Sequence, residues 1–203
     1  MRSKYLSLFI WLSSLIFIGS SCSTAKNFST KFYYEHEATL NKIEQSYKSC
    51  YEQHPFTIVF TDKQFSTLSI EIITDTLTYI YQFDVHEARL ADTLNKYQLN
   101  TAGIMELITQ MKAIHCLWLN NLDYYVDERK RSVVLISIKP VSFNSPFAYK
   151  KYYILSYFSQ PQYFDEAGRL LVKRRLRKIH KINGEIFRRI NDKICYTISG
   201  RFR

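Results

Sequence analysis

Apolar residues recur three or four positions apart between residues 28 and 53, with charged residues between them. This spacing places the apolar side chains along one side of a helix, so the sequence predicts an amphipathic helix over residues 28–53 with one buried stripe. The stripe consists of Phe32, His36, Leu40, Ile43, Tyr47 and Cys50. Pro55 ends the helix, because proline disfavours a helical conformation in the residue before it.

A second helical pattern begins at Thr101, a residue type that commonly caps a helix N-terminus. Its apolar face is formed by Ile104, Leu107, Ile108, Met111, His115 and Trp118. The polar stretch before it predicts a short helix near residues 87–97. We therefore expect two well-formed helices and one shorter helix.

Segments rich in β-branched and aromatic residues predict strands. These segments are residues 56–61, 68–73, 77–83, 122–126, 133–138 and 152–158. Residues 74–76 form a polar turn between two of them, residues 127–131 a charged hairpin tip, and residues 140–146 a loop. The short connections predict antiparallel neighbours, because parallel strands need long crossovers.

The C-terminal end allows two interpretations. Turn signals at residues 165–168, Asn183-Gly184 and 191–192 divide it into strands 170–181, 185–190 and 193–199, which is a β-meander. A helix fits the same stretch, because several apolar residues lie on one helical face and Gly184 follows them. These residues are Leu171, Val172, Leu176, Ile179 and Ile182. The hairpin would place Lys178 opposite Arg189, which disfavours it. The spacing of the turns favours the meander.

The composition indicates one folded domain. Hydrophobic residues make up 46% and aromatic residues 16% of the 203 positions, which excludes a disordered chain. The length suits one core rather than two. We expect a single α+β domain over residues 31–203, with the N-terminal helix and a second helix packed on an antiparallel sheet that ends in a C-terminal β-meander.

The first 22 residues have the organisation of an export signal. Arg2 and Lys4 precede an uncharged apolar run from Tyr5 to Gly19, and two serines follow it. The run has 15 residues. A helix of that length spans about 22 Å, which is less than the hydrocarbon layer of about 30 Å. The sequence therefore predicts a cleaved signal peptide over residues 1–21.

Cys22 directly follows the small residues Ser20 and Ser21. This arrangement resembles the lipobox of bacterial lipoproteins, although Gly19 occupies the position where that family usually has an aliphatic residue. The resemblance implies cleavage before Cys22, lipid attachment to its sulfur and a location in the bacterial cell envelope, where acyl chains hold the protein on a membrane. Residues 22–30 would then form a polar tether. A secreted protein and an uncleaved membrane helix extending through residue 25 are the alternatives.

Positive charge is concentrated at the C-terminal end. The formal net charge is +10, and residues 168–203 contain twelve of the 28 lysines and arginines but two of the 18 acidic residues. The candidate anion-binding residues are Arg174, Arg175, Arg177, Lys178, Lys181, Arg188 and Arg189. Such a region attracts an anionic lipid, a glycolipid or an acidic protein. Export disfavours nucleic acid as a partner, and a solvated charged face is the alternative.

The cysteines and histidines form no metal-ligand or catalytic motif. The spacing of Cys50, Cys116 and Cys195 matches no zinc or haem pattern, and their apolar surroundings favour buried free thiols. No phosphate-binding loop or hydrolase motif is present, so we expect no metal and no cofactor. The sequence thus favours a lipid-anchored envelope protein with a binding or structural role. The alternative is a small exported hydrolase or transferase with an unrecognised site.

Overall fold

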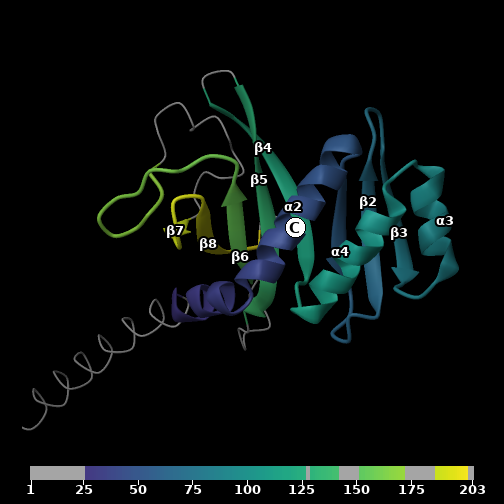
Figure 1. Cartoon of the computed structure of the whole chain (residues 1–203), viewed down its shortest axis with the longest axis horizontal. Helices are drawn as coiled ribbons and strands as arrows, with labels where there is room; N and C mark the ends of the chain where they lie inside the picture. The colour runs from purple at the N-terminus through teal and green to yellow at the C-terminus, as the bar shows by residue number, and fades with distance from the viewer. Residues whose placement is uncertain (1–25, 127–128, 142–150, 172–185, 201–203) are drawn as a thin grey trace, which may run out of the picture.

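In the computed structural model, the described residues are 26–126, 129–141, 151–171 and 186–200. Within them, eight strands form one antiparallel sheet in the order β3-β2-β1-β4-β5-β6-β8-β7 (Figure 1). The strands are β1 (Phe56–Phe60), β2 (Thr67–Ile73), β3 (Thr78–Asp84), β4 (Trp118–Val126), β5 (Arg129–Val141), β6 (Lys151–Phe158), β7 (Arg188–Arg189) and β8 (Ile194–Ser199). The sheet and its helices confirm the predicted α+β fold.

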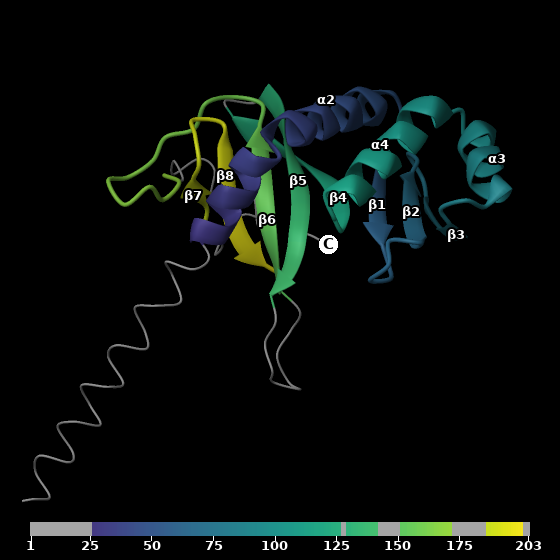
Figure 2. The ribbon, with the colours of Figure 1, turned by 60° about the horizontal axis from the view of Figure 1, so that its bottom comes forward.

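The helices lie on one face of this sheet (Figure 2). They comprise residues 26–35, α2 (Glu37–Gln53), α3 (Ala88–Lys96) and α4 (Thr101–Ala113). α2 and α4 run side by side over the central strands, and α3 packs near the edge strand β3. The helical layer therefore covers the sheet along most of its width.

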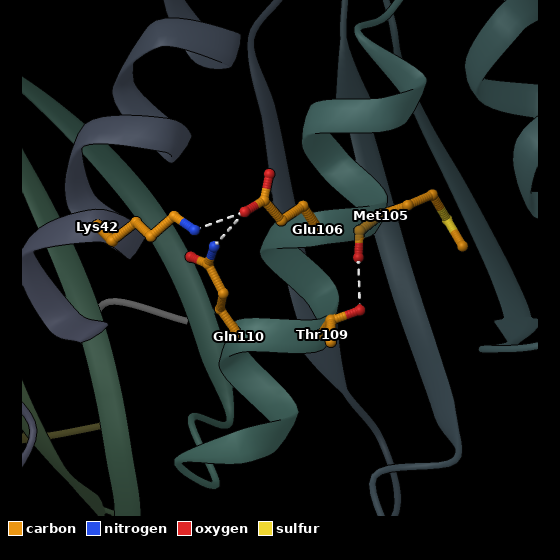
Figure 3. A network of polar contacts seen from close by, with 5 residues as sticks. All are labelled: Lys42, Met105, Glu106, Thr109 and Gln110. Atoms are coloured by element: carbon orange, nitrogen blue, oxygen red, sulfur yellow. Dashed lines mark hydrogen bonds and ion pairs between the residues drawn. The ribbon is translucent and has the colours of Figure 1, made fainter.

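A polar network joins the outer surfaces of α2 and α4 (Figure 3). Lys42 Nζ lies 2.6 Å from Glu106 Oε1, and Gln110 Nε2 donates to the same oxygen at 3.0 Å. The ion pair with Lys42 lowers the pKa of Glu106. More than half of both charged side chains is exposed, so the pair adds little to stability.

The N-terminal helix breaks at His36, where the single helix predicted from the sequence is wrong. His36 has φ −122° and ψ 17°, which departs from helical geometry and divides the segment into residues 26–35 and α2. Within α2 the predicted stripe is buried, at Leu40, Ile43, Tyr47 and Cys50. Before the break, Ser29 and Tyr33 are buried and Phe32 is half-buried. Ser29, Tyr33 and Leu40 are four and seven residues apart, so the buried side stays in phase across the break.

The second helix is shorter than predicted. Its N-cap is Asn100 rather than Thr101, because Asn100 Oδ1 accepts a hydrogen bond from the Gly103 N–H at 3.0 Å. The helix ends at Ala113, and His115 has a φ of 55° that reverses the chain. Trp118 opens β4, so neither it nor His115 belongs to the helical face. The first apolar residue of β4, Trp118, lies at the position where the next apolar residue of a longer helix would be. Apolar spacing alone therefore cannot show that the helix has ended.

β5 extends further than predicted at both of its ends. Arg129–Arg131, expected in the hairpin tip, pair with Val126–Tyr124, so the tip contracts to residues 127–128, which lie outside the described residues. Pro140, expected in a loop, pairs with Tyr152 after a register shift between Ser137 and Lys139. β4 pairs with β5 only as far as Ser137, so the missing N–H of Pro140 removes no ladder bond on that side.

The C-terminal strands are described only in part. The turn at residues 165–168 is present, with the Gly168 N–H donating to the Asp165 carbonyl at 2.9 Å and Gly168 at φ 70°. β8 pairs with β7, as the predicted meander requires, and its other side pairs with β6. Leu170 forms one bridge, with Phe164. Most of the predicted strand 170–181 and the turn at Asn183-Gly184 lie outside the described residues.

Apolar side chains cover both faces of the sheet in the part formed by β4, β5, β6 and β8. Consecutive strand residues point to opposite faces, so Leu119 joins the core under the helices while Trp118 joins a second cluster on the other face. That second cluster spans β4, β5, β6 and β8, and Phe164, Leu170 and Phe187 pack onto it. Residues after β6 therefore supply the second layer that the helices supply on the first face.

Candidate functional site

The structure describes two of the seven candidate anion-binding residues. Arg188 and Arg189 form β7, the last strand of the sheet. The other five lie within residues 172–185, outside the described residues, namely Arg174, Arg175, Arg177, Lys178 and Lys181. The predicted grouping of all seven stays a prediction.

The two described arginines differ in their surroundings. The Arg189 guanidinium is half exposed, forms an ion pair with Asp192 at 2.5 Å and lies 5.5 Å from the centre of the Phe164 ring. Arg188 is half-buried and bridges to Arg169 on the outer side of β7. β7 thus presents arginines at the sheet edge, and part of the charge of Arg189 is neutralised by its neighbour.

The start of the N-terminal helix lies at the same end of the molecule as β7 (Figures 1 and 2). The Phe28 ring packs 4.8 Å from that of Tyr153 in β6, and Asn191 Nδ2, between β7 and β8, donates to the Tyr33 hydroxyl at 3.4 Å. The described helix includes residues 26–30, which the sequence analysis assigned to the tether. Three residues lie between Cys22 and Lys26, so the four steps along the chain can span at most about 14 Å.

A polar cleft of about 420 Å³ opens between the C-terminal end of α2 and the β4–β5 hairpin. Its volume is within the range of small-ligand sites. It is lined by Lys48, Tyr51, Glu52, Pro55, Asn121, Asp123, Lys130, Arg131, Ser132 and Ser159. None of these residues is a histidine or a cysteine. This cleft could not be predicted from the sequence, because the residues that line it come from four separate segments.

Asp123 organises the polar side chains of the cleft. Lys130 Nζ lies 2.9 Å from Asp123 Oδ2, and Asn121 Nδ2 donates to Asp123 Oδ1 at 3.0 Å. Burial raises the pKa of Tyr51 beside them, so its hydroxyl keeps its proton at neutral pH. Together with Lys48, these groups can donate hydrogen bonds to a small polar or anionic ligand. They contain no activated nucleophile.

The three described cysteines are free and buried, as predicted. Burial raises the pKa of all three thiols, to about 12 for Cys195. A thiol with a raised pKa stays protonated, and only the thiolate is a good nucleophile or metal ligand. Cys50, Cys116 and Cys195 are therefore core residues.

The four described histidines do not assemble into a group of ligating side chains. His115 is exposed and lies beyond the end of the helix on whose apolar face the sequence analysis placed it. In the part of the chain that the structure describes, no group of three or more His, Cys, Asp or Glu side chains is arranged to hold a metal ion. Among the described residues, no helix is both long enough and apolar enough to cross a lipid bilayer.

Comparison of the chain with protein-family models, with curated proteins and with solved structures finds no significant match.

Proposed function

We propose that the protein is a lipid-anchored protein of the bacterial envelope whose role is binding rather than catalysis. Lipid on Cys22 holds it to a membrane, and the arginine-bearing end of the sheet, from β7 into the basic segment 172–185, faces the anionic surface of that membrane. An acidic protein is the other partner class with the same charge requirement.

One observation carries this proposal: the start of the N-terminal helix and β7 lie at the same end of the molecule (Figure 1). An anchor at Cys22 is at most about 14 Å of chain from that helix. It therefore brings the β7 end, rather than the β3 end, close to the bilayer. Juxtamembrane lysines and arginines each gain about 1 kcal/mol near an anionic surface.

The hydrolase or transferase alternative gains no support from the described residues. The polar cleft holds carboxylates and lysines, and the described thiols are buried with raised pKa values. General acid–base or nucleophilic catalysis needs a titratable group near neutral pH or an activated nucleophile at a cleft. The cleft instead suits a small polar ligand held by Lys48, Asn121 and Lys130.

The test uses the full chain reconstituted into two kinds of vesicle, one of phosphatidylcholine alone and one with added phosphatidylglycerol. Hydrogen–deuterium exchange is followed at the amides of residues 186–199. We expect slower exchange of the β7–β8 amides on the anionic vesicles. The difference should disappear at about 1 M salt, where the screening length falls to about 3 Å.

Charge-removing variants locate the effect. The double variant Arg174→Gln with Arg175→Gln should lose most of the difference between the two vesicles. The matched control is Lys63→Gln with Lys96→Gln, which removes two exposed charges outside the basic end and should keep the full difference. If the β7–β8 amides of the wild-type chain exchange equally fast on neutral and anionic vesicles, the membrane-facing role is excluded.

A further inference from the structure

The two edges of the sheet are built differently. β7 has two residues, both arginines, and residues 168–170 bond to its outer side, where the Leu170 N–H donates to the Phe187 carbonyl at 3.0 Å. β3 has seven residues with the sequence TYIYQFD and contains neither proline nor lysine. Proteins usually protect an edge strand by making it short, charged or covered, because an open edge pairs with other strands. The β7 edge is protected in this way and the β3 edge is not.

The hydrogen bonds of β3 identify which of its backbone groups are free. In the β2–β3 ladder, Thr74 N–H donates to the Leu77 carbonyl and Val85 N–H to the Ser66 carbonyl. Bonded and non-bonded pairs alternate along an antiparallel ladder. Tyr79, Tyr81 and Phe83 therefore bond to β2. The backbone groups of Thr78, Ile80, Gln82 and Asp84 point outward.

The outward groups of Asp84 are already used within the chain. Its N–H donates to Glu87 Oε2 at 3.4 Å, and its carbonyl accepts from the Glu87 N–H at 3.0 Å. Thr78, Ile80 and Gln82 remain, and no described residue bonds to their outward N–H and C=O groups. These three residues are arranged symmetrically about Ile80.

The symmetry makes the edge complementary to a second copy of itself. When two β3 strands pair antiparallel about a two-fold axis at Ile80, Ile80 lies opposite Ile80 and Thr78 lies opposite Gln82. All of these are hydrogen-bonded pairs, so six main-chain bonds form. A register centred on Tyr81 would instead require the groups of Asp84 that Glu87 already occupies.

The side chains at this edge also suit a second copy. Leu77 is 57% and Ile80 66% exposed, although both are large apolar residues. α3 packs on the other face, where the Tyr81 and Tyr97 hydroxyls lie 2.6 Å apart, so Ile80 is left uncovered. Residues 77–82 carry no charge, which means that pairing places no like charges opposite each other.

The distribution of charge over the molecule is compatible with pairing of two β3 strands. The net charge of +10 comes from residues 168–203, and the rest of the chain is balanced. β3 and β7 are the two terminal strands of the sheet and lie at opposite ends of the molecule (Figure 1). Two copies joined through β3 therefore keep the arginines of their two β7 strands apart.

We propose that the protein forms a two-fold symmetric dimer through β3, in which the antiparallel pairing of Ile80 with Ile80 joins two sheets into one. Closed two-fold contacts of this kind are the commonest form of homo-oligomer. The dimer removes the exposed edge of each copy and leaves both protected β7 edges at its outer ends. The contact does not require the lipid on Cys22.

Cysteine cross-linking tests the register in the full chain purified in detergent. Opposed residues of a hydrogen-bonded pair have Cα atoms about 5.5 Å apart, which a disulfide can bridge. Mild oxidation should therefore link Ile80→Cys into a covalent dimer. Thr78→Cys is the matched control, because residue 78 faces Gln82 and the two cysteines lie too far apart. Equal cross-linking of both variants, or of neither, would overturn the proposed register.

Light scattering across a range of protein concentrations tests the association itself. Ile80→Lys should weaken dimerisation at least tenfold. Gln82→Pro should do the same, because it removes an outward N–H and no bond to β2. Ile186→Lys, which changes an isoleucine that is 59% exposed, should leave dimerisation unchanged. Circular dichroism of each variant checks that it is folded. A wild-type chain that stays monomeric at every concentration would overturn the proposal.

Discussion

The carboxylate of Asp62 organises the loop between β1 and β2. It accepts hydrogen bonds from the backbone N–H groups of Gln64, Ser66 and Thr67, the shortest at 2.8 Å, and from the Ser66 hydroxyl at 2.7 Å. These bonds lower the pKa of Asp62 from 3.8 to about 2, the bond from Thr67 having the largest effect. The charged form is therefore the one that the loop stabilises.

This lowered pKa predicts a pH dependence of stability. The unfolded chain takes up the Asp62 proton at a higher pH than the folded chain does, so the stabilisation is complete above about pH 4 and is lost as the pH falls toward about 2. Asp62→Asn should lower the urea midpoint at pH 7, and the difference from the wild type should shrink by pH 3. Asp92→Asn, at an exposed position of α3, is the control and should have little effect at either pH.

Some properties of single residues were predictable from the sequence and others were not. The apolar surroundings of Cys50, Cys116 and Cys195 were enough to predict buried thiols, because burial follows the local pattern. The position of Trp118 was mispredicted. Its spacing continues that of Met111 and His115, but the chain reverses at His115 and places it in a strand. A reversal through positive φ at a residue other than glycine leaves little trace in the sequence.

At the scale of elements, α4 provides a direct test of what caps a helix. The Asn100 side chain accepts the Gly103 N–H, whereas the Thr101 hydroxyl donates to Asn95 Oδ1 at 2.6 Å and bonds to no helix N–H group. Asn100→Ala should therefore lower the free energy of unfolding by about 1 kcal/mol, measured by urea denaturation. Asn100→Asp, which keeps a capping oxygen, should stay near the wild type. A larger loss from Thr101→Val than from Asn100→Ala would restore Thr101 as the cap.

Strands rich in β-branched and aromatic residues were predicted to within one residue at each end, as the bounds of β1, β2, β3 and β6 show. The predictions failed where a strand contains residues that are atypical of strands. Arg129–Arg131 pair within the β4–β5 hairpin, and Pro140 is tolerated where one neighbour is missing. In both places the pairing partner, rather than the strand's own residues, decides the conformation.

At the scale of the whole molecule, the anchor remains the prediction to test first. If Cys22 is acylated, the mature N-terminal peptide from a bacterial membrane fraction should begin at Cys22 and carry the added lipid mass. Cys22→Ser should abolish both the cleavage and the lipid. Ser20→Ala keeps a small residue near the cut and should be processed normally. A mature chain that keeps Met1, or a new N-terminus without lipid, would contradict lipid anchoring.

Of the three candidate surfaces, the basic C-terminal region could be predicted from the sequence, but the polar cleft and the open β3 edge could not. The excess of lysines and arginines after residue 168 can be counted in the sequence. The cleft and the open edge cannot, because both depend on which strands become neighbours. Turn signals indicated the β2–β3 hairpin, but not that β1 pairs with β4 and leaves β3 at the edge. Long-range strand order is set by the whole core.

The packing of the N-terminal helix limits how a soluble version of the protein can be made. Phe28 contacts Tyr153, and Lys139 Nζ lies 5.4 Å from the centre of the Phe28 ring. A shortened chain that starts at residue 31 would uncover part of β6 and lose the buried Ser29. Expression for crystallisation or nuclear magnetic resonance should therefore retain Lys26 and everything after it.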